Sequence, residues 1–170
     1  MVWVSVLCWL GAALALWRPV TERYGWHRRP TLGVLLSAAL VGVVTLTPDG
    51  WFRLRDPQSC LELAPGAFGY AGGHLLAGPQ EVANILLVVP LGFFLVLAGR
   101  QVMAPAIVVV VLPVLVELLQ AAFAQRVCTV LDWFDNTLGG LLGVAAGAVV
   151  LAVRARRAAR RRDRPVGADR

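Results

Sequence analysis

Glu117 and Gln120 are the residues of this chain whose types and spacing most directly indicate chemistry. They lie three residues apart inside the apolar run from Val102 to Ala124, and residues at this spacing share one face of a helix. The run has the roughly 20 apolar residues that a helix needs to cross a bilayer core. A carboxylate in such a span costs about 3 kcal/mol on insertion scales and rarely faces lipid. The pair therefore predicts a polar site inside a helix bundle.

Two interpretations of Glu117 are open from the residues alone. It is either a proton-binding, substrate-binding or catalytic carboxylate, or one member of a structural hydrogen-bond network between helices. Pro113 removes the donor for the carbonyl of Val109, so we expect a kink just before the pair. Glu117 lies six residues before Phe123, which is about 9 Å from that end of the run at 1.5 Å per residue. This distance predicts a site in the outer half of the bilayer.

Further polar residues follow the run. Arg126 and Asp132 bracket the short segment RVCTVLD. Arg126 either reaches Glu117 or Asp132 through its planar guanidinium, or anchors the helix end at the membrane interface. Asp135 and Asn136 precede the last apolar segment, and we expect one of them to be its N-cap. The other is then free to face the site.

Asn84 opens the third apolar segment, which also contains Pro90 and Gly92. An Asn in a span either bonds a neighbouring helix or takes part in a site. Glycines at four-residue spacing predict a face where another helix approaches closely; they are Gly139, Gly143 and Gly147.

The sequence shows no zinc, haem, P-loop or dinucleotide motif, and His27 and His74 lack ligand-like spacing, so we expect no metal and no cofactor. Cys8 falls in the first apolar segment. Cys60 and Cys128 both fall on the proposed outer side, where an oxidising exterior permits a bridge, but sequence alone does not decide their pairing.

The chain has 170 residues and is 58% hydrophobic, which favours the membrane class. We predict an all-α transmembrane bundle of about five spans, with four spans and an interfacial first segment as the alternative. The expected spans are Val2–Trp17, Leu32–Leu46, Val82–Ala98, Val102–Phe123 and Thr137–Val153.

The net charge is +6, from 16 arginines and 10 acidic residues. Of the arginines, 13 fall in Arg18–Thr31, Gly99–Gln101 and the tail from Arg154. The positive-inside rule then places the N-terminus outside and the C-terminus inside. We expect the tail to contact lipid headgroups, and we expect no nucleic-acid partner.

The segments NILLVVPLGF, ELLQ and RVCTVLDWFDNTLGGLLG, between Asn84 and Gly143, together resemble the VanZ-like family of bacterial membrane proteins. Family members follow Asn and Pro-x-Gly by Glu-x-x-Gln, Arg and Asp-x-x-x-Asn-x-x-Gly. Here these places are filled by Asn84, Pro90, Gly92, Glu117, Gln120, Arg126, Asp132, Asn136 and Gly139. The chain departs from the family at Thr129, where an acidic residue is frequent. Asp135 is the candidate to replace that acid in space.

The resemblance implies a multi-pass protein of the bacterial cytoplasmic membrane, in a family associated with resistance to the glycopeptide teicoplanin. We assign residues 1–153 to a VanZ-like helical domain, with the motifs in 82–147 and an outer loop in 47–81, and residues 154–170 to a basic cytoplasmic tail. The expected polar cluster is Asn84, Glu117, Gln120, Arg126, Asp132 and Asn136.

Three functions are open. The first is binding of an envelope lipid or lipoglycopeptide at the polar site. The second is an intramembrane enzyme acting on an envelope lipid or peptide, with Glu117 as its candidate general base. The third is a proton-coupled transporter, which would need a homo-oligomer along the glycine face because five spans without a repeat lack an alternating-access frame.

Overall fold

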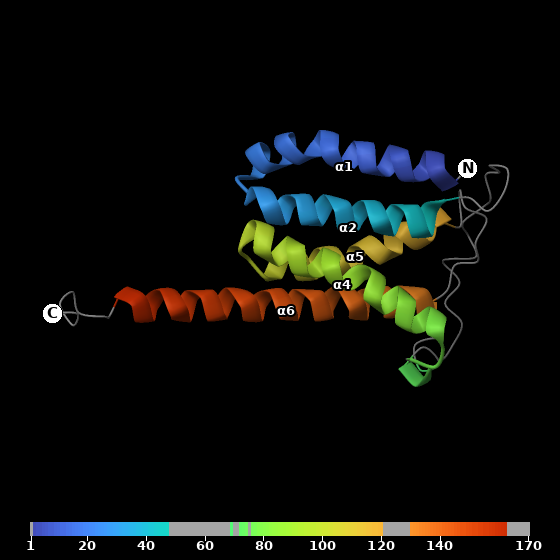
Figure 1. The fold of residues 1–170 in the computed structure, drawn as a ribbon. Coiled ribbons are helices and arrows are strands. Elements are labelled where there is room, and N and C mark those ends of the chain that lie inside the picture. Colours follow the sequence, from blue (N-terminus) through green and yellow to red (C-terminus); the bar gives the residue numbers. More distant parts are fainter. Residues whose placement is uncertain (1, 48–68, 70–71, 75, 121–129, 163–170) are drawn as a thin grey trace.

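The computed structural model describes residues 2–47, 69, 72–74, 76–120 and 130–162. Within these ranges the chain forms helices and no strand, as the all-α prediction requires (Figure 1). The helices are α1 (Val2–Tyr24), α2 (Arg28–Leu46), α4 (Pro79–Gly99), α5 (Met103–Leu119) and α6 (Val130–Arg162). Four of them are long and apolar enough to cross a membrane, whereas α5 is a shorter apolar helix of 17 residues.

The helices α1, α2 and α4 run alternately up and down the bundle. The hydroxyls of Ser5 and Thr47 share a hydrogen bond of 2.8 Å, so the start of α1 lies beside the end of α2. The start of α2 lies beside the end of α4, because the amide of His27 donates to the carbonyl of Ala98 at 3.3 Å. α1 thus runs along α2 in the bundle (Figure 1), which favours a spanning first segment over one lying across the interface.

α4 and α6 run parallel and approach each other through glycine. A Cβ atom on Gly139 would collide with the carbonyl oxygen of Ile85, and one on Gly143 with the carbonyl oxygen of Val89. Gly147 continues this contact against the backbone of Phe93. The predicted glycine face therefore lies against α4 of the same chain. Beside it the main apolar core contains Val88, Leu91, Val96, Val109 and Val144.

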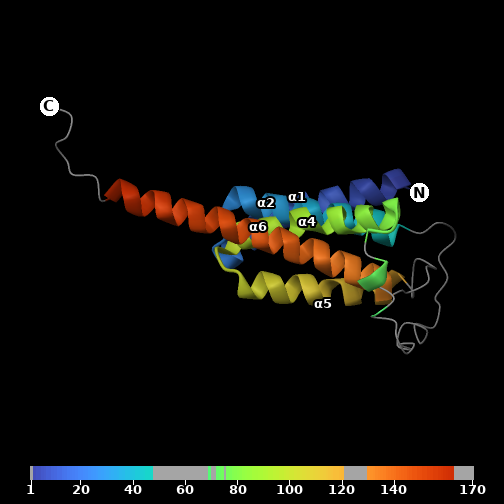
Figure 2. The same ribbon diagram turned by 90° about the horizontal axis from the view of Figure 1, so that it is seen from below.

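α5 covers another side of α6 and runs antiparallel to it (Figure 2). A Cβ atom on Gly140 would collide with the side chain of Val109, and the indole of Trp133 donates to the carbonyl of Val110 at 3.3 Å. Pro113 lies inside α5 and does not end it. Val110 directly follows Val109, whose carbonyl this proline leaves without its helical donor.

Two predicted boundaries were wrong. α1 does not end at Trp17 but continues through Arg18 and Pro19 to Tyr24. Asp135 and Asn136 do not cap the last helix, because α6 already begins at Val130 and both residues lie inside it. Contacts with α4 and α5 hold this first part of α6, so the polar residues that resemble a helix start are instead buried between helices.

The two ends of the bundle carry different groups of residues (Figure 1). The start of α1, the end of α2, the start of α4, the end of α5 and the start of α6 meet at one end, which we call the acidic end because Glu81, Glu117, Asp132 and Asp135 lie toward it. The α1–α2 and α4–α5 turns lie at the other, which we call the arginine end. α6 passes this second end and carries Arg154–Arg162 beyond the other helices.

Candidate functional site

A hydrogen bond between Asn84 and Asp132 connects α4 to α6 at the acidic end. The side-chain amide of Asn84 donates to a carboxylate oxygen of Asp132 at 2.7 Å. An amide–carboxylate bond is charge-assisted and stronger than a bond between two neutral groups. Two residues that the sequence assigned to a polar cluster, 48 positions apart, are therefore brought together by the fold.

Gln120 makes a second connection, between α5 and α2. Its side-chain amide donates to the backbone carbonyl of Thr45 at 3.0 Å, and the bond is buried. The last carbonyls of a helix have no partner within the helix, so Gln120 satisfies one of them at the end of α2. This bond fixes the end of α5 in the bundle.

Glu117 is buried, with 4% of its surface exposed. It lies eight residues after Val109, which is about 12 Å along α5 at 1.5 Å per residue. Val109 contacts α6 at Gly140. Asp132 lies eight residues before Gly140. Because α6 runs antiparallel to α5, Asp132 lies about the same distance from this contact toward the acidic end. Glu117 and Asp132 therefore occupy a similar depth, as expected for two members of one polar site.

Asp135 is the most unusual residue of this region. It is fully buried, at 0% exposure, and neither of its carboxylate oxygens has a hydrogen-bond partner among the described residues. The same holds for the side-chain oxygens of the next two residues, Asn136 and Thr137, which are also buried. A buried polar group without a partner costs about 1–3 kcal/mol, and a charged group costs more. Three consecutive residues of α6 thus carry buried side-chain oxygens that have no hydrogen-bond partner among the described residues.

Among the described residues, the charged neighbours of Asp135 offer it no hydrogen-bond donor or positive charge. Glu81 and Asp132 both interact with it electrostatically, and both carry the same sign of charge as an ionised aspartate. No group of three or more His, Cys, Asp or Glu side chains in the described part of the chain is placed to hold a metal ion. The arrangement therefore calls for hydrogen-bond donors, or for a positively charged group, from outside these residues.

Sequence reasoning missed several polar residues near the site. Thr45 acts through its backbone carbonyl, which no side-chain pattern reveals. Glu81 was counted with the preceding loop, but α4 begins at Pro79; the helical signal was its spacing of three from Asn84, which places both residues on one face. Trp133 and Thr137 are neighbours of predicted residues, and a last helix starting near Val130 would have included them.

Some predicted residues lie outside the part of the chain that the structure describes. Arg126 and Thr129 are among them, as are Cys60 and Cys128. The proposed contacts of Arg126 and the Cys60–Cys128 bridge therefore stay predictions. Cys8 is a free, exposed cysteine on α1.

Comparison with known proteins identifies the family of this chain. No curated protein and no solved structure matches the chain. The family model described as VanZ/LLP1 matches residues 4–151, which is most of the chain and includes every helix around the site. The chain belongs to the VanZ/LLP1 family, and with its apolar helices it is a VanZ-like membrane protein.

Proposed function

We propose that this protein binds the polar headgroup of an amphiphile of the bacterial envelope, a lipid or a lipoglycopeptide, at the acidic end of the bundle. The observation that carries the proposal is the buried carboxyl group of Asp135, whose two oxygens have no hydrogen-bond partner among the described residues. Native proteins pair most buried polar atoms. An unmatched group of this kind is explained when a bound molecule completes its hydrogen bonds.

The chemistry of the unmatched atoms indicates what such a molecule offers. Asp135, Asn136 and Thr137 present side-chain oxygens, and acceptors are complemented by hydroxyl or amino donors. Nearby Glu81 and Asp132 make the surroundings negative, which favours amines and sugar hydroxyls. Ethanolamine headgroups, aminosugars and the amino and sugar groups of lipoglycopeptides have this chemistry.

The depth of the site suits a headgroup. Asp135 lies five residues after the start of α6, or about 8 Å along the helix axis. If α6 spans the bilayer, Asp135 lies closer to its headgroup region than to its midplane. A lipid tail would then contact the apolar outer surface of the bundle while its headgroup enters between the helices. By the distribution of arginines, we place this end at the outer leaflet of the bacterial cytoplasmic membrane.

Binding measured on the full-length chain in lipid nanodiscs tests this function. The probes are phosphatidylethanolamine and teicoplanin, with phosphatidylcholine of the same acyl chains as the ligand control because its headgroup has no amino or hydroxyl donor. We expect Asp135→Asn and Glu117→Gln to weaken binding at least tenfold, which corresponds to about 1.4 kcal/mol. Glu22→Gln is the matched control, since Glu22 is an exposed acid toward the arginine end.

Equal binding by the wild type and both site variants would rule out this site. Release of a cleaved or modified lipid during the assay, lost in Glu117→Gln, would instead favour the enzyme. The transporter is less well supported, because the glycine face it would need for a homodimer lies against α4 of the same chain.

A further inference from the structure

Four arginines surround a cavity at the arginine end, opposite the proposed headgroup site. The cavity has a volume of about 420 Å³. Three separate parts of the chain contribute to it: the start of α2, the end of α4 with the following turn, and the second half of α6. Its lining residues are His27, Arg28, Arg29, Pro30, Leu97, Arg100, Leu151 and Arg154.

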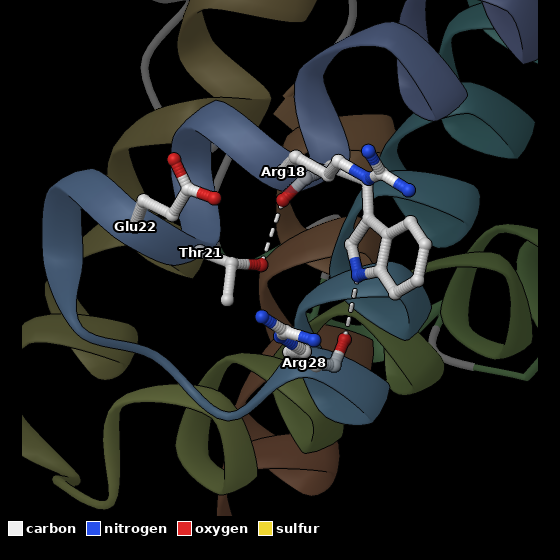
Figure 3. A pocket seen from close by; sticks show the side chains of 5 residues that line it. Arg18, Thr21, Glu22 and Arg28 are labelled. Atoms are coloured by element: carbon white, nitrogen blue, oxygen red, sulfur yellow. Dashed lines mark hydrogen bonds between the residues drawn. The ribbon is translucent and has the colours of Figure 1, made fainter.

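Hydrogen bonds hold the backbone of the α1–α2 corner, which carries Arg28 and Arg29. The indole of Trp17 donates to the carbonyl of Arg28 at 2.8 Å (Figure 3). The hydroxyl of Thr31 donates to the carbonyl of His27 at 2.9 Å, and the amide of His27 donates to α4. The corner is therefore held to both neighbouring helices, and the start of α2 adds the partial positive charge of a helix N-terminus.

Arg100 is placed by an unusual backbone conformation. It follows α4 in the left-handed region, with φ 53° and ψ 36°, where glycine or asparagine is the usual residue. The chain has a glycine one position earlier, at Gly99, but the left-handed position holds an arginine. A non-glycine residue in this conformation is strained by roughly 1 kcal/mol, so this turn keeps an arginine at the cavity at a cost in stability.

A neighbouring cavity provides a contrast. Its volume is about 290 Å³, and it is lined by Trp17, Arg18, Thr21, Glu22 and Arg28 (Figure 3). There Glu22 offsets part of the arginine charge. The described residues that line the larger cavity include no Asp or Glu, so no acidic side chain among them offsets the charge of its four arginines.

We propose that the four-arginine cavity binds the phosphate group of an anionic membrane lipid. Guanidinium groups match phosphate through paired hydrogen bonds. The apolar lining residues Pro30, Leu97 and Leu151 suit the first carbons of acyl chains. Inorganic phosphate is also an anion, but it has no apolar part to pack against these side chains. The site is separate from the proposed headgroup site and carries the opposite charge.

The test is native mass spectrometry of the full-length protein exchanged into an equimolar mixture of phosphatidylglycerol and phosphatidylcholine with the same acyl chains. The wild type should retain phosphatidylglycerol selectively. Because each of these guanidinium groups is expected to make a charge-assisted hydrogen bond to the phosphate, Arg100→Ala and Arg154→Ala should each lower its retention about tenfold. Arg161→Ala is the matched control: it removes the same charge from an exposed position of α6 two turns beyond Arg154.

Equal losses in all three variants, or equal retention of both lipids by the wild type, would overturn the proposal, because either result indicates only general surface electrostatics. Complete displacement of phosphatidylglycerol by millimolar inorganic phosphate would overturn the lipid as its occupant. Circular dichroism checks that each variant is folded. Arg154→Lys keeps the positive charge and removes only the contacts that the guanidinium group makes. Asp135→Asn should leave the retention of phosphatidylglycerol unchanged. A result against the four-arginine cavity is therefore distinguishable from a result against the proposed headgroup site.

Discussion

At the scale of single residues, the bond between Asn84 and Asp132 is the contact at the acidic end whose strength is most directly measurable. It is 2.7 Å long and charge-assisted. We expect a double-mutant cycle with Asn84→Ala and Asp132→Ala to give a coupling energy of about 1.5–3 kcal/mol, the range for hydrogen bonds to charged groups. Chemical denaturation of the purified protein in detergent provides the measurement.

The hydroxyl pair of Ser5 and Thr47, which also connects two helices, supplies the control cycle. Its bond joins two neutral groups, so its coupling energy should stay near or below about 1 kcal/mol. A coupling energy for Asn84 and Asp132 no larger than this would show that their bond adds little to the fold. The interpretation of Asp132 as a preorganised part of the site would then lose its energetic support.

The sequence allowed part of the site to be predicted at this scale. The cost of an intramembrane charge correctly indicated that Glu117 is buried. The same reasoning was not applied to Asp135, because an Asp-Asn pair before an apolar run resembles a helix cap. Capping preference is a local property, whereas the burial of Asp135 depends on where α4 and α5 lie, and spacing along one helix does not contain that information.

At the scale of helices, the contact between α4 and α6 depends on the absence of side chains at its glycines, among them Gly139 and Gly143. We expect Gly139→Ala to destabilise the protein by about 1–3 kcal/mol, the usual cost of overpacking, because its Cβ would meet the backbone oxygen of Ile85. Gly11→Ala is the control, since nothing lies within 4 Å of a Cβ there. That substitution should be neutral or stabilising by up to about 1 kcal/mol.

Thermal unfolding of the two variants in the same detergent distinguishes these expectations. Similar midpoints for Gly139→Ala and Gly11→Ala would mean that α4 and α6 can separate at little cost. The positions of Asn84 and Asp132 would then not depend on the glycine contact, and a less rigid site would have to be considered.

Helix existence and order were predictable because each apolar run is long enough to identify. Some of the helix ends were not. Pro19 and Arg18 resemble a stop signal, yet α1 continues through both to Tyr24. The hydroxyl of Thr21 donates to the carbonyl of Trp17 at 2.7 Å, and the indole of the same tryptophan bonds α2. Tertiary contacts of this kind extend a helix past residues that would end it in isolation.

At the scale of the whole molecule, α6 connects the two proposed sites. Asp135 and Arg154 lie 19 residues apart on this helix, or about 28 Å at 1.5 Å per residue. The hydrocarbon core of a bilayer is about 30 Å thick. One helix therefore carries a carboxylate toward one headgroup layer and a guanidinium toward the other. This match supports a bundle that spans the membrane with the acidic and arginine ends on opposite sides.

The orientation of these ends gives the last prediction. The positive-inside rule predicts that the arginine end lies in the cytoplasm. In a variant with Cys8, Cys60 and Cys128 replaced by serine, a single cysteine at Gln80 should react with a membrane-impermeant maleimide in intact cells. One at Arg156 should react only after the cells are opened. Both positions are exposed, so the maleimide meets an exposed side chain in each variant. The reverse pattern would place the acidic end, and with it the proposed headgroup site, at the inner leaflet, where extracellular glycopeptides do not reach it.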